Sequence, residues 1–279
     1  MFISDKIVFI HLQKTGGVHI SQLFSLLICG EKITGHPPLE EAQRSKFIIG
    51  SIRNPWDWYV SLWAYGCKNK GSTKHNLTRQ LNSSKIDTML GKGINGYHPP
   101  AWQRWKIRRA EKNKNVQQWL ECYQDSNDPE QFRQWLRLLL NSRHKRDIQE
   151  GFALSPVSKD GGLLTYRHLV LQSTLGKKLY TDSSLQNYSK LKNAFHSNSL
   201  LNHTIRTEHI TEDMLSIIDK IGVADITTAK ELVMAKGKKR HNTSNRNSAA
   251  FYYDKQSREL VAEKDRLVID LYNYKEPIE

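Results

Sequence analysis

One short segment combines the residue types that could hold an anion. Lys14, Thr15, Gly16 and Gly17 are consecutive and follow the apolar run Ile7–Ile10. Lysine supplies a full positive charge and threonine a hydroxyl donor, while two glycines let the backbone approach a ligand closely and adopt positive φ angles. Where such a turn leads into a helix, the unpaired N–H groups of the first turn add a partial positive charge. The segment is therefore a candidate anion cradle, and phosphate is its natural ligand.

The order of these residues separates the segment from the common nucleotide-binding loop. In the pattern G-x-x-x-x-G-K-[ST] the lysine and the hydroxyl residue follow the glycines, whereas Lys14 and Thr15 precede them. This order disfavours an ordinary ATPase or GTPase and indicates a different phosphate ligand. A purely structural role is the competing interpretation, since strand–Gly-Gly–helix connections are common turns.

A second basic residue that could bind an anion lies in the segment Lys46–Cys67, which reads KFIIGSIRNPWDWYVSLWAYGC. The apolar run Phe47–Ile52 predicts a buried strand, and Arg53 follows at its carboxyl end. Asn54–Pro55 then predicts the start of a helix, because proline suits the first helical turn. Ligands of open α/β sheets bind outside the carboxyl ends of the strands. We therefore expect Arg53 at the same rim as Lys14, where a guanidinium can grip a phosphate through two hydrogen bonds.

The elements that must position these residues alternate between strands and helices. Short β-branched or alternating segments predict four strands, at Ile7–Ile10, Lys32–His36, Phe47–Ile52 and Leu200–Arg206. Helical spacing follows Gly17, and further helices are predicted at Ala101–Tyr123, Pro129–Leu140 and Leu163–Leu175, after Thr211, and in the tail from Ala249 onward. This alternation predicts an α/β fold with a parallel sheet of about four or five strands flanked by helices.

The middle of the chain gives weaker signals. Lys68–Pro100 is polar and rich in glycine, which predicts a long loop. The large apolar side chains of the two helices that follow are expected in the core: Trp102, Trp105, Trp119, Phe132, Trp135 and Leu139. Some of these aromatic rings are alternatively suited to stacking on an acceptor molecule.

Composition limits the class of protein. The chain has 279 residues and a formal net charge of +14, which attracts anions and leaves a nucleic-acid-binding protein as a non-enzyme alternative. The basic residues are scattered, however, and no zinc finger, RNA-binding aromatic signature or basic zipper is found. No apolar run approaches the roughly 18 residues of a membrane span. The three cysteines lack metal or disulfide spacing. These features, with a strand beginning close to Met1, predict a cytoplasmic protein without a signal peptide.

Three motifs together resemble one enzyme family. FIHLQKTGG resembles the 5′-phosphosulfate loop of sulfotransferases that use 3′-phosphoadenosine 5′-phosphosulfate (PAPS), and IRNPWDWYVSLW resembles their 3′-phosphate motif. The tail NTSNRNSAAFYYDKQSRELVAEKDRLVIDLYNY is similar to their C-terminal block. The order and separation of the motifs also match, over roughly the first 65 and the last 80 residues. The similarity is greatest to carbohydrate-type and bacterial sulfotransferases.

The resemblance implies a P-loop-NTPase-like fold in a single domain, 1–279, in which 68–160 forms a loop and helical insertion that shapes the acceptor site. It implies PAPS as co-substrate, with no metal. The residues that it assigns to this co-substrate are Lys14, Thr15, Gly16, Gly17, Arg53, Ser61, Asn242, Ser244 and Arg246. Gln13, Val18 and His19 depart from the family pattern, which has proline, threonine and serine at these positions.

The resemblance also implies the chemistry. A sulfuryl group would pass to an acceptor hydroxyl, with a sugar or polysaccharide as the leading acceptor. His36, in the pair Gly35–His36, matches the family's general base, and its ordinary pKa near 6.5 suits that role. His11, Asp57 or a carboxylate of the middle region are the alternatives. Lys14 would stabilise the charge that grows on the leaving phosphate oxygen. A P-loop nucleotide kinase and a nucleic-acid-binding protein are the rival functions, and the oligomeric state is left open.

Overall fold

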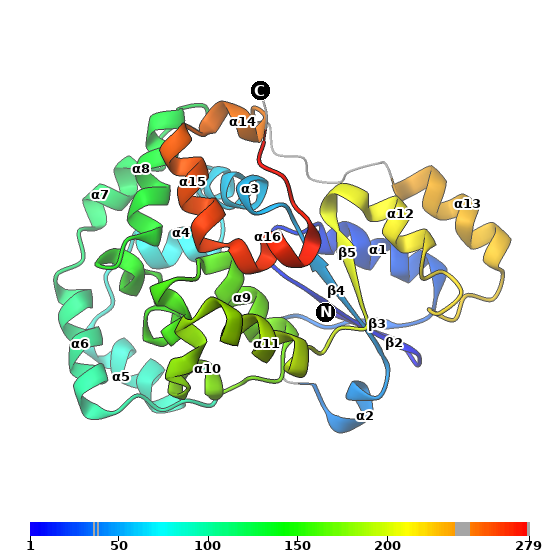
Figure 1. Ribbon diagram of the computed structural model, residues 1–279, viewed down its shortest axis with the longest axis horizontal. Helices are drawn as coiled ribbons and strands as arrows, with labels where there is room; N and C mark the ends of the chain where they lie inside the picture. Colours follow the sequence, from blue (N-terminus) through cyan, green and yellow to red (C-terminus); the bar gives the residue numbers. More distant parts are fainter. Residues whose placement is uncertain (36, 38, 238–245, 278–279) are drawn as a thin grey trace. The chain divides into compact units, whose positions relative to one another are not determined.

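The computed structural model describes residues 1–35, 37, 39–237 and 246–277, and they form two compact units (Figure 1). We call them the sheet unit and the helical unit. The sheet unit comprises Met1–Asn54, Leu171–Thr174 and Asn198–Thr243. The helical unit comprises Pro55–Val170, Leu175–Ser197 and Ser244–Glu279. Each unit is assembled from segments that are distant in the sequence, and the region 68–160 expected as an insertion falls entirely in the helical unit.

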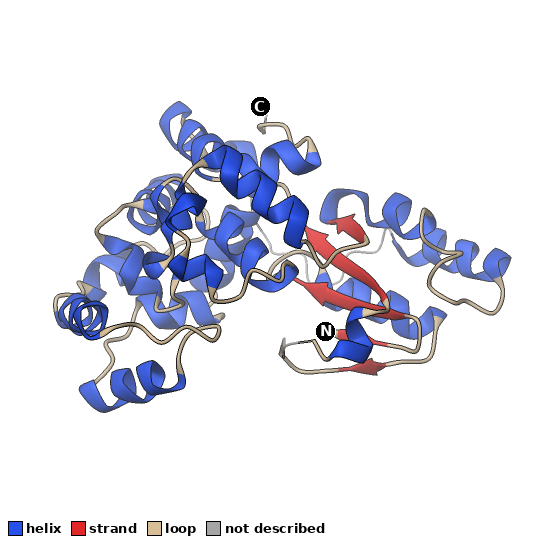
Figure 2. Ribbon diagram, turned by 60° about the horizontal axis from the view of Figure 1, so that its bottom comes forward, coloured by secondary structure: helices blue, strands red, loops and turns tan. Residues whose placement is uncertain are grey.

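The sheet unit contains a five-stranded mixed sheet with the order β3-β1-β2-β4-β5 (Figure 2). Its strands are β1 (Phe2–Ile3), β2 (Ile7–His11), β3 (Glu31–Lys32), β4 (Phe47–Ile52) and β5 (His203–Arg206). Strands β2, β4 and β5 are parallel, whereas β1 is antiparallel to both of its neighbours. The α/β class is thus confirmed, but the expectation of a parallel sheet is wrong for the β1 side. Strand β1 was not predicted, because two residues are too few to show a pattern.

The central strand β2 is buried on both faces, as its unbroken apolar sequence requires. On one face, Phe9 packs in a cluster with residues of α1 (Gly17–Leu27), α12 (Ile210–Leu215) and α13 (Ile226–Gly237). On the other face, Val8 and Ile10 pack with Ile48. Two layers of apolar side chains therefore fix the strand, and with it the position of the residues that follow His11.

The helical unit is built almost entirely of helices. Its α-helices are α3 (Pro55–Cys67), α4 (Ser72–Leu77), α5 (Ser83–Lys92), α6 (Ala101–Lys112), α7 (Val116–Glu121), α8 (Pro129–Leu140), α10 (Lys178–Thr181), α11 (Tyr188–Asn198), α14 (Ala249–Tyr252), α15 (Lys255–Lys264) and α16 (Arg266–Tyr272). Short 3₁₀ helices lie at His144–Ile148, Phe152–Leu154, Pro156–Lys159 and Ser183–Gln186. Helix α9 (Leu163–Gln172) belongs to the helical unit up to Val170 and to the sheet unit beyond it. The sheet unit also contains α2 (Glu41–Arg44) and the 3₁₀ helix Thr207–His209.

The prediction of a long loop at Lys68–Pro100 is wrong, because this segment forms α4 and α5. Helix α5 begins where the Asn82 side chain accepts a hydrogen bond from the Lys85 N–H, which is a regular N-cap. Helix α5 was not predicted because its sequence is mostly polar, and only its side chains Ile86 and Leu90 are buried. Amphipathic periodicity over ten residues is a weak signal when the apolar stripe contains so few side chains.

An aromatic core holds the helical unit together, and α3 supplies much of it. Trp56, Trp58, Tyr59 and Trp63 are all buried to 1% exposure or less. The Tyr59 hydroxyl donates to Asp265 at 2.6 Å, at the junction of α15 and α16. The C-terminal segment thereby packs against the start of the unit, as the contacts of α14 and α15 with α3 and α8 also show (Figure 1).

Asp265 is the polar centre of this core. It is fully buried, and it also accepts hydrogen bonds from the backbone N–H and the hydroxyl of Thr165, both at 2.8 Å. Burial raises the pKa of the Asp265 carboxyl above its ordinary value, while the hydrogen bonds from Tyr59 and Thr165 act in the opposite direction. Removal of this one side chain would leave several buried donors without an acceptor.

We therefore expect Asp265→Ala to lower the free energy of unfolding by about 3 kcal/mol, through the unsatisfied donors and the cavity. Asp160→Ala, at an exposed position of the same unit, should change it by less than about 0.5 kcal/mol. Urea unfolding of both variants measures the difference. Equal stability of the two variants would contradict the role given to Asp265.

Candidate functional site: the turn after strand β2

The turn between β2 and α1 has an unusual backbone. Lys14 has a φ angle of 67° and Gly16 a φ angle of 75°, so two residues of the turn are in the left-handed region. Glycine adopts this conformation readily, but lysine rarely does. Gly16 is also the N-cap residue of α1. Because glycine has no side chain, it offers no acceptor to the first N–H groups of the helix. The turn thus directs a helix N-terminus and a lysine backbone to the carboxyl edge of the sheet.

Gly17 is required by a close contact, not by its φ angle. A Cβ atom at this position would lie 2.2 Å from Cδ2 of His11 and 2.3 Å from its Cγ, far inside van der Waals contact. The imidazole of His11 in turn stacks on Phe9, with ring centroids 5.6 Å apart. The last residue of β2 and the first residue of α1 are therefore packed directly against each other. This contact sets the angle at which the helix leaves the strand.

Thr15 stabilises the turn from inside. Its side chain is fully buried, and its hydroxyl lies 2.7 Å from the carbonyl oxygen of Leu12 and 2.6 Å from the hydroxyl of Ser51. Ser51 is on β4, so this hydroxyl pair joins the turn to the neighbouring strand. The Thr15 hydroxyl is therefore held by two partners within the protein, and the assignment of Thr15 to a ligand stays a prediction.

Arg53 joins the second motif to the first. Its Nη1 donates a hydrogen bond to the carbonyl oxygen of Lys14 at 3.2 Å. Arg53 lies one residue beyond β4, as the sequence predicted, and its side chain is half-buried. The structure therefore brings Lys14 and Arg53 together at one rim, and both cations belong to the same compact unit.

The chain after β5 completes this rim. Glu208 accepts a hydrogen bond from the backbone N–H of Asn54 at 2.8 Å, and the Thr207 hydroxyl donates to the carbonyl oxygen of Ile52, also at 2.8 Å. Gln172 donates to the carbonyl oxygens of Ile10 and Ser51 at 3.2 Å each, between the ends of β2 and β4. These contacts hold the carboxyl ends of three parallel strands in register.

Sequence reasoning missed these supporting residues. Ser51 and Gln172 lie inside elements whose pattern indicates only burial, and Thr207 and Glu208 directly follow the strand that was predicted to end at Arg206. A pattern of this kind cannot show which polar side chain bonds to which backbone group when the partners are more than a hundred residues apart. Only the observation that Ser51 is the single hydroxyl in the run FIIGSI offered a signal.

The electrostatic character of the rim is positive. Lys14 and Arg53 provide two full charges, and the first turn of α1 has no acidic residue to offset the helix dipole. Arg206, at the end of β5, is paired with Asp213 at 2.6 Å, and Glu208 places one carboxylate at the same rim. The arrangement can bind an oxyanion through backbone N–H groups, with a lysine and an arginine as charged partners.

Two predicted site residues belong to the helical unit. Ser61 is on α3 and is buried to 3% exposure. Arg246 forms an ion pair with Asp57, and its side chain is 9% exposed. Asp57 is thus engaged by a guanidinium in this structure, and its role as an alternative general base stays a prediction. The assignment of Ser61 and Arg246 to a nucleotide stays a prediction.

The remaining predicted residues, His36, Asn242 and Ser244, lie outside the described residues. The strand before His36 is shorter than expected, since β3 contains only Glu31 and Lys32. It runs in the same direction as β2 and is separated from it by β1, about 10 Å away.

Comparisons with protein-family models, curated proteins and solved structures find no match to this chain. Among the described residues, no group of three or more His, Cys, Asp or Glu side chains is arranged to hold a metal ion. In the same part of the chain, no helix has the length and apolar character needed to cross a membrane.

The contact between Gly17 and His11 leads to a test of the turn. We expect Gly17→Ala to lower the free energy of unfolding by about 1–3 kcal/mol, because the new Cβ overlaps the imidazole. Gly91→Ala is the control, since a Cβ there meets open space on a helix and should stabilise by up to about 1 kcal/mol. In a double-mutant cycle, His11→Gly should relieve part of the Gly17→Ala effect. Strict additivity would show that the two residues are not in contact.

Proposed function

We propose that this protein is a sulfotransferase that transfers a sulfuryl group from PAPS to an acceptor hydroxyl. The observation that carries the proposal is the hydrogen bond from Arg53 to the carbonyl of Lys14, which unites two phosphate motifs at the carboxyl ends of adjacent strands. Each motif resembles a different phosphate site of the same nucleotide. A phosphate at each of two neighbouring positions is the pattern that a 3′,5′-bisphosphorylated adenosine presents.

The residues of the turn between β2 and α1 would bind the 5′ end of the nucleotide. Backbone N–H groups of Gly16 and Gly17 and the Lys14 ammonium would bind the 5′-phosphate, with Thr15 buried beneath them as a brace. Lys14 would stabilise the negative charge that develops on the leaving phosphate oxygen. The left-handed backbone at Lys14 is consistent with this role, because strained backbone conformations cluster at ligand-binding sites.

Arg53 would bind the 3′-phosphate of the nucleotide. A guanidinium can bind a phosphate through two hydrogen bonds, and its bond to Lys14 would couple occupation of one site to the geometry of the other. Ser61, Asn242, Ser244 and Arg246 remain predicted partners of the nucleotide.

In the proposed reaction, the bond between sulfur and the phosphate oxygen breaks and a bond from sulfur to the acceptor oxygen forms. The acceptor hydroxyl loses its proton to a base, and adenosine 3′,5′-bisphosphate leaves. His36 is the proposed base, with His11 as the alternative within the sheet unit. A carbohydrate hydroxyl is the acceptor that the motif style favours.

Arg53→Ala tests the nucleotide assignment. We expect it to weaken the binding of adenosine 3′,5′-bisphosphate by about 2–5 kcal/mol, because it removes a desolvated charge partner. Arg44→Ala is the matched control: Arg44 is an exposed arginine of the same unit and should leave the affinity unchanged. Isothermal titration calorimetry measures both, and circular dichroism verifies that the variants are folded. Wild-type affinity in Arg53→Ala would refute the assignment.

The base can be identified with a second pair of variants. If His36 is the base, His36→Ala lowers turnover by about 10²- to 10⁴-fold and leaves the affinity for adenosine 3′,5′-bisphosphate unchanged. His11→Ala should then retain most of the turnover. Transfer of labelled sulfuryl groups to a panel of carbohydrates supplies the assay. The reverse result would assign the role to His11, and activity in both variants would point to a carboxylate.

A further inference from the structure

Helix α6 exposes two large aromatic side chains that were expected in the core. Trp102 is 57% exposed and Trp105 is 55% exposed, whereas Trp119, Phe132, Trp135 and Leu139 are fully buried as predicted. Seven tryptophans occur in the chain, and the other five are exposed by 1% or less. Exposure of two indole rings, three residues apart on one helix, requires an explanation other than packing.

Cations cover the same face of the helix. The Lys106 ammonium lies 4.9 Å from the centroid of the Trp102 ring, and the Arg109 guanidinium lies 5.3 Å from that of Trp105. Each cation follows its tryptophan by four residues, so the two pairs repeat along one stripe of the helix. Lys106 and Arg109 are both exposed. The outer face of α6, defined by these four side chains, therefore combines two indole rings with two positive charges.

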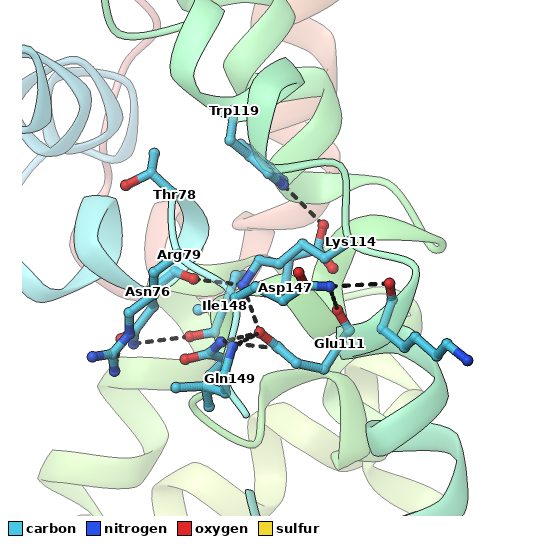
Figure 3. A network of polar contacts seen from close by, with 12 residues as sticks. Asn76, Thr78, Arg79, Glu111, Lys114, Trp119, Asp147, Ile148 and Gln149 are labelled. Atoms are coloured by element: carbon cyan, nitrogen blue, oxygen red, sulfur yellow. Dashed lines mark hydrogen bonds and ion pairs between the residues drawn. The ribbon is translucent and has the colours of Figure 1, made fainter. Parts of the chain in front are cut away.

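The opposite face of α6 is held rigidly by a buried polar network (Figure 3). Glu111 is 5% exposed, and its carboxylate accepts hydrogen bonds from the backbone of Leu81 at 2.7 Å and from Gln149 at 3.0 Å. Just beyond the helix, the Lys114 ammonium donates to the carbonyl of Asn76 at 2.6 Å and lies 3.6 Å from Glu111. The network fixes the rotation of α6 about its axis, so Trp102 and Trp105 cannot turn inward without breaking it.

We propose that the outer face of α6 docks on an anionic phospholipid surface. Tryptophan favours the interface between membrane and water, where its ring is apolar and its N–H can remain hydrated. Lys106 and Arg109 would contact lipid phosphates at the same depth. The shape agrees with a flat partner: the outer side of a helix is convex, whereas single-stranded nucleic acid is usually bound in a groove that follows its backbone. This proposal does not depend on the sulfotransferase assignment.

The charge pattern limits how α6 would bind. Arg108 is paired with Asp87 at 2.5 Å, so Lys106 and Arg109 carry the accessible charge of the stripe. Two cations and two rings support reversible attachment, in which the helix lies on the headgroups and does not span the bilayer. The affinity should therefore rise with the fraction of anionic lipid and fall with added salt.

Vesicle binding tests this proposal directly. The intact protein is mixed with vesicles of phosphatidylcholine alone, or with one third phosphatidylglycerol, and sedimented. We expect binding to the anionic vesicles only. Vesicles with brominated acyl chains should quench part of the tryptophan fluorescence, and this signal reports on Trp102 and Trp105 because the other five indoles are buried. The quenching should be lost in Trp102→Ala/Trp105→Ala.

Matched variants separate the outer face from the general positive charge. Lys106→Glu/Arg109→Glu should weaken binding to anionic vesicles by about tenfold or more. Lys177→Glu/Lys178→Glu changes the net charge equally at two exposed lysines elsewhere in the helical unit and should have a much smaller effect. Equal effects of the two pairs, no binding of the wild type, or tryptophan quenching by oligouridylate without vesicle binding would each overturn the proposal.

Discussion

The sheet unit depends on one constraint: the chain must turn from a buried strand into a helix within five residues, at the carboxyl ends of the parallel strands. Two left-handed residues, Lys14 and Gly16, make that turn, and the contact of Gly17 with His11 sets its angle. Thr15 then fills the interior of the turn and bonds to Ser51 on the next strand. A larger residue at position 17 or a missing hydroxyl at position 15 would displace the helix N-terminus that the proposed ligand needs.

The same constraint explains the residues around the turn. Arg53 can reach the Lys14 carbonyl only because β2 and β4 are parallel and adjacent, with His11 opposite Ser51. The Glu208 carboxylate offsets part of the positive charge of the rim. It also accepts a hydrogen bond from the backbone N–H of Asn54, which fixes the residue after Arg53. The Arg53 guanidinium is therefore oriented by a backbone contact before any anion arrives, and such preorganisation lowers the entropic cost of binding.

The sequence predicted the sheet unit better than the helical unit, for a physical reason. Strand β4 and the glycine turn are local features, in which burial and backbone geometry are dictated by neighbouring residues. The burial of Trp119 was predicted by the same periodicity that failed for Trp102 and Trp105, because a periodic pattern cannot say whether a partner covers a face. The helices of Lys68–Pro100 were missed since their stability comes from tertiary contacts, such as the bond of Asn76 to the Ile148 carbonyl. Pairing of distant segments, as in Tyr59 with Asp265, is likewise invisible in a single sequence.

We propose that this rim recognises a nucleotide by phosphates at both its 3′ and 5′ positions. The most direct measurement is calorimetry of the wild-type protein with adenosine 3′,5′-bisphosphate and with adenosine 5′-monophosphate under the same conditions. A desolvated arginine–phosphate contact predicts that the bisphosphate binds at least about 30-fold more tightly. Equal affinities for the two nucleotides, or preferential binding of ATP, would contradict the account.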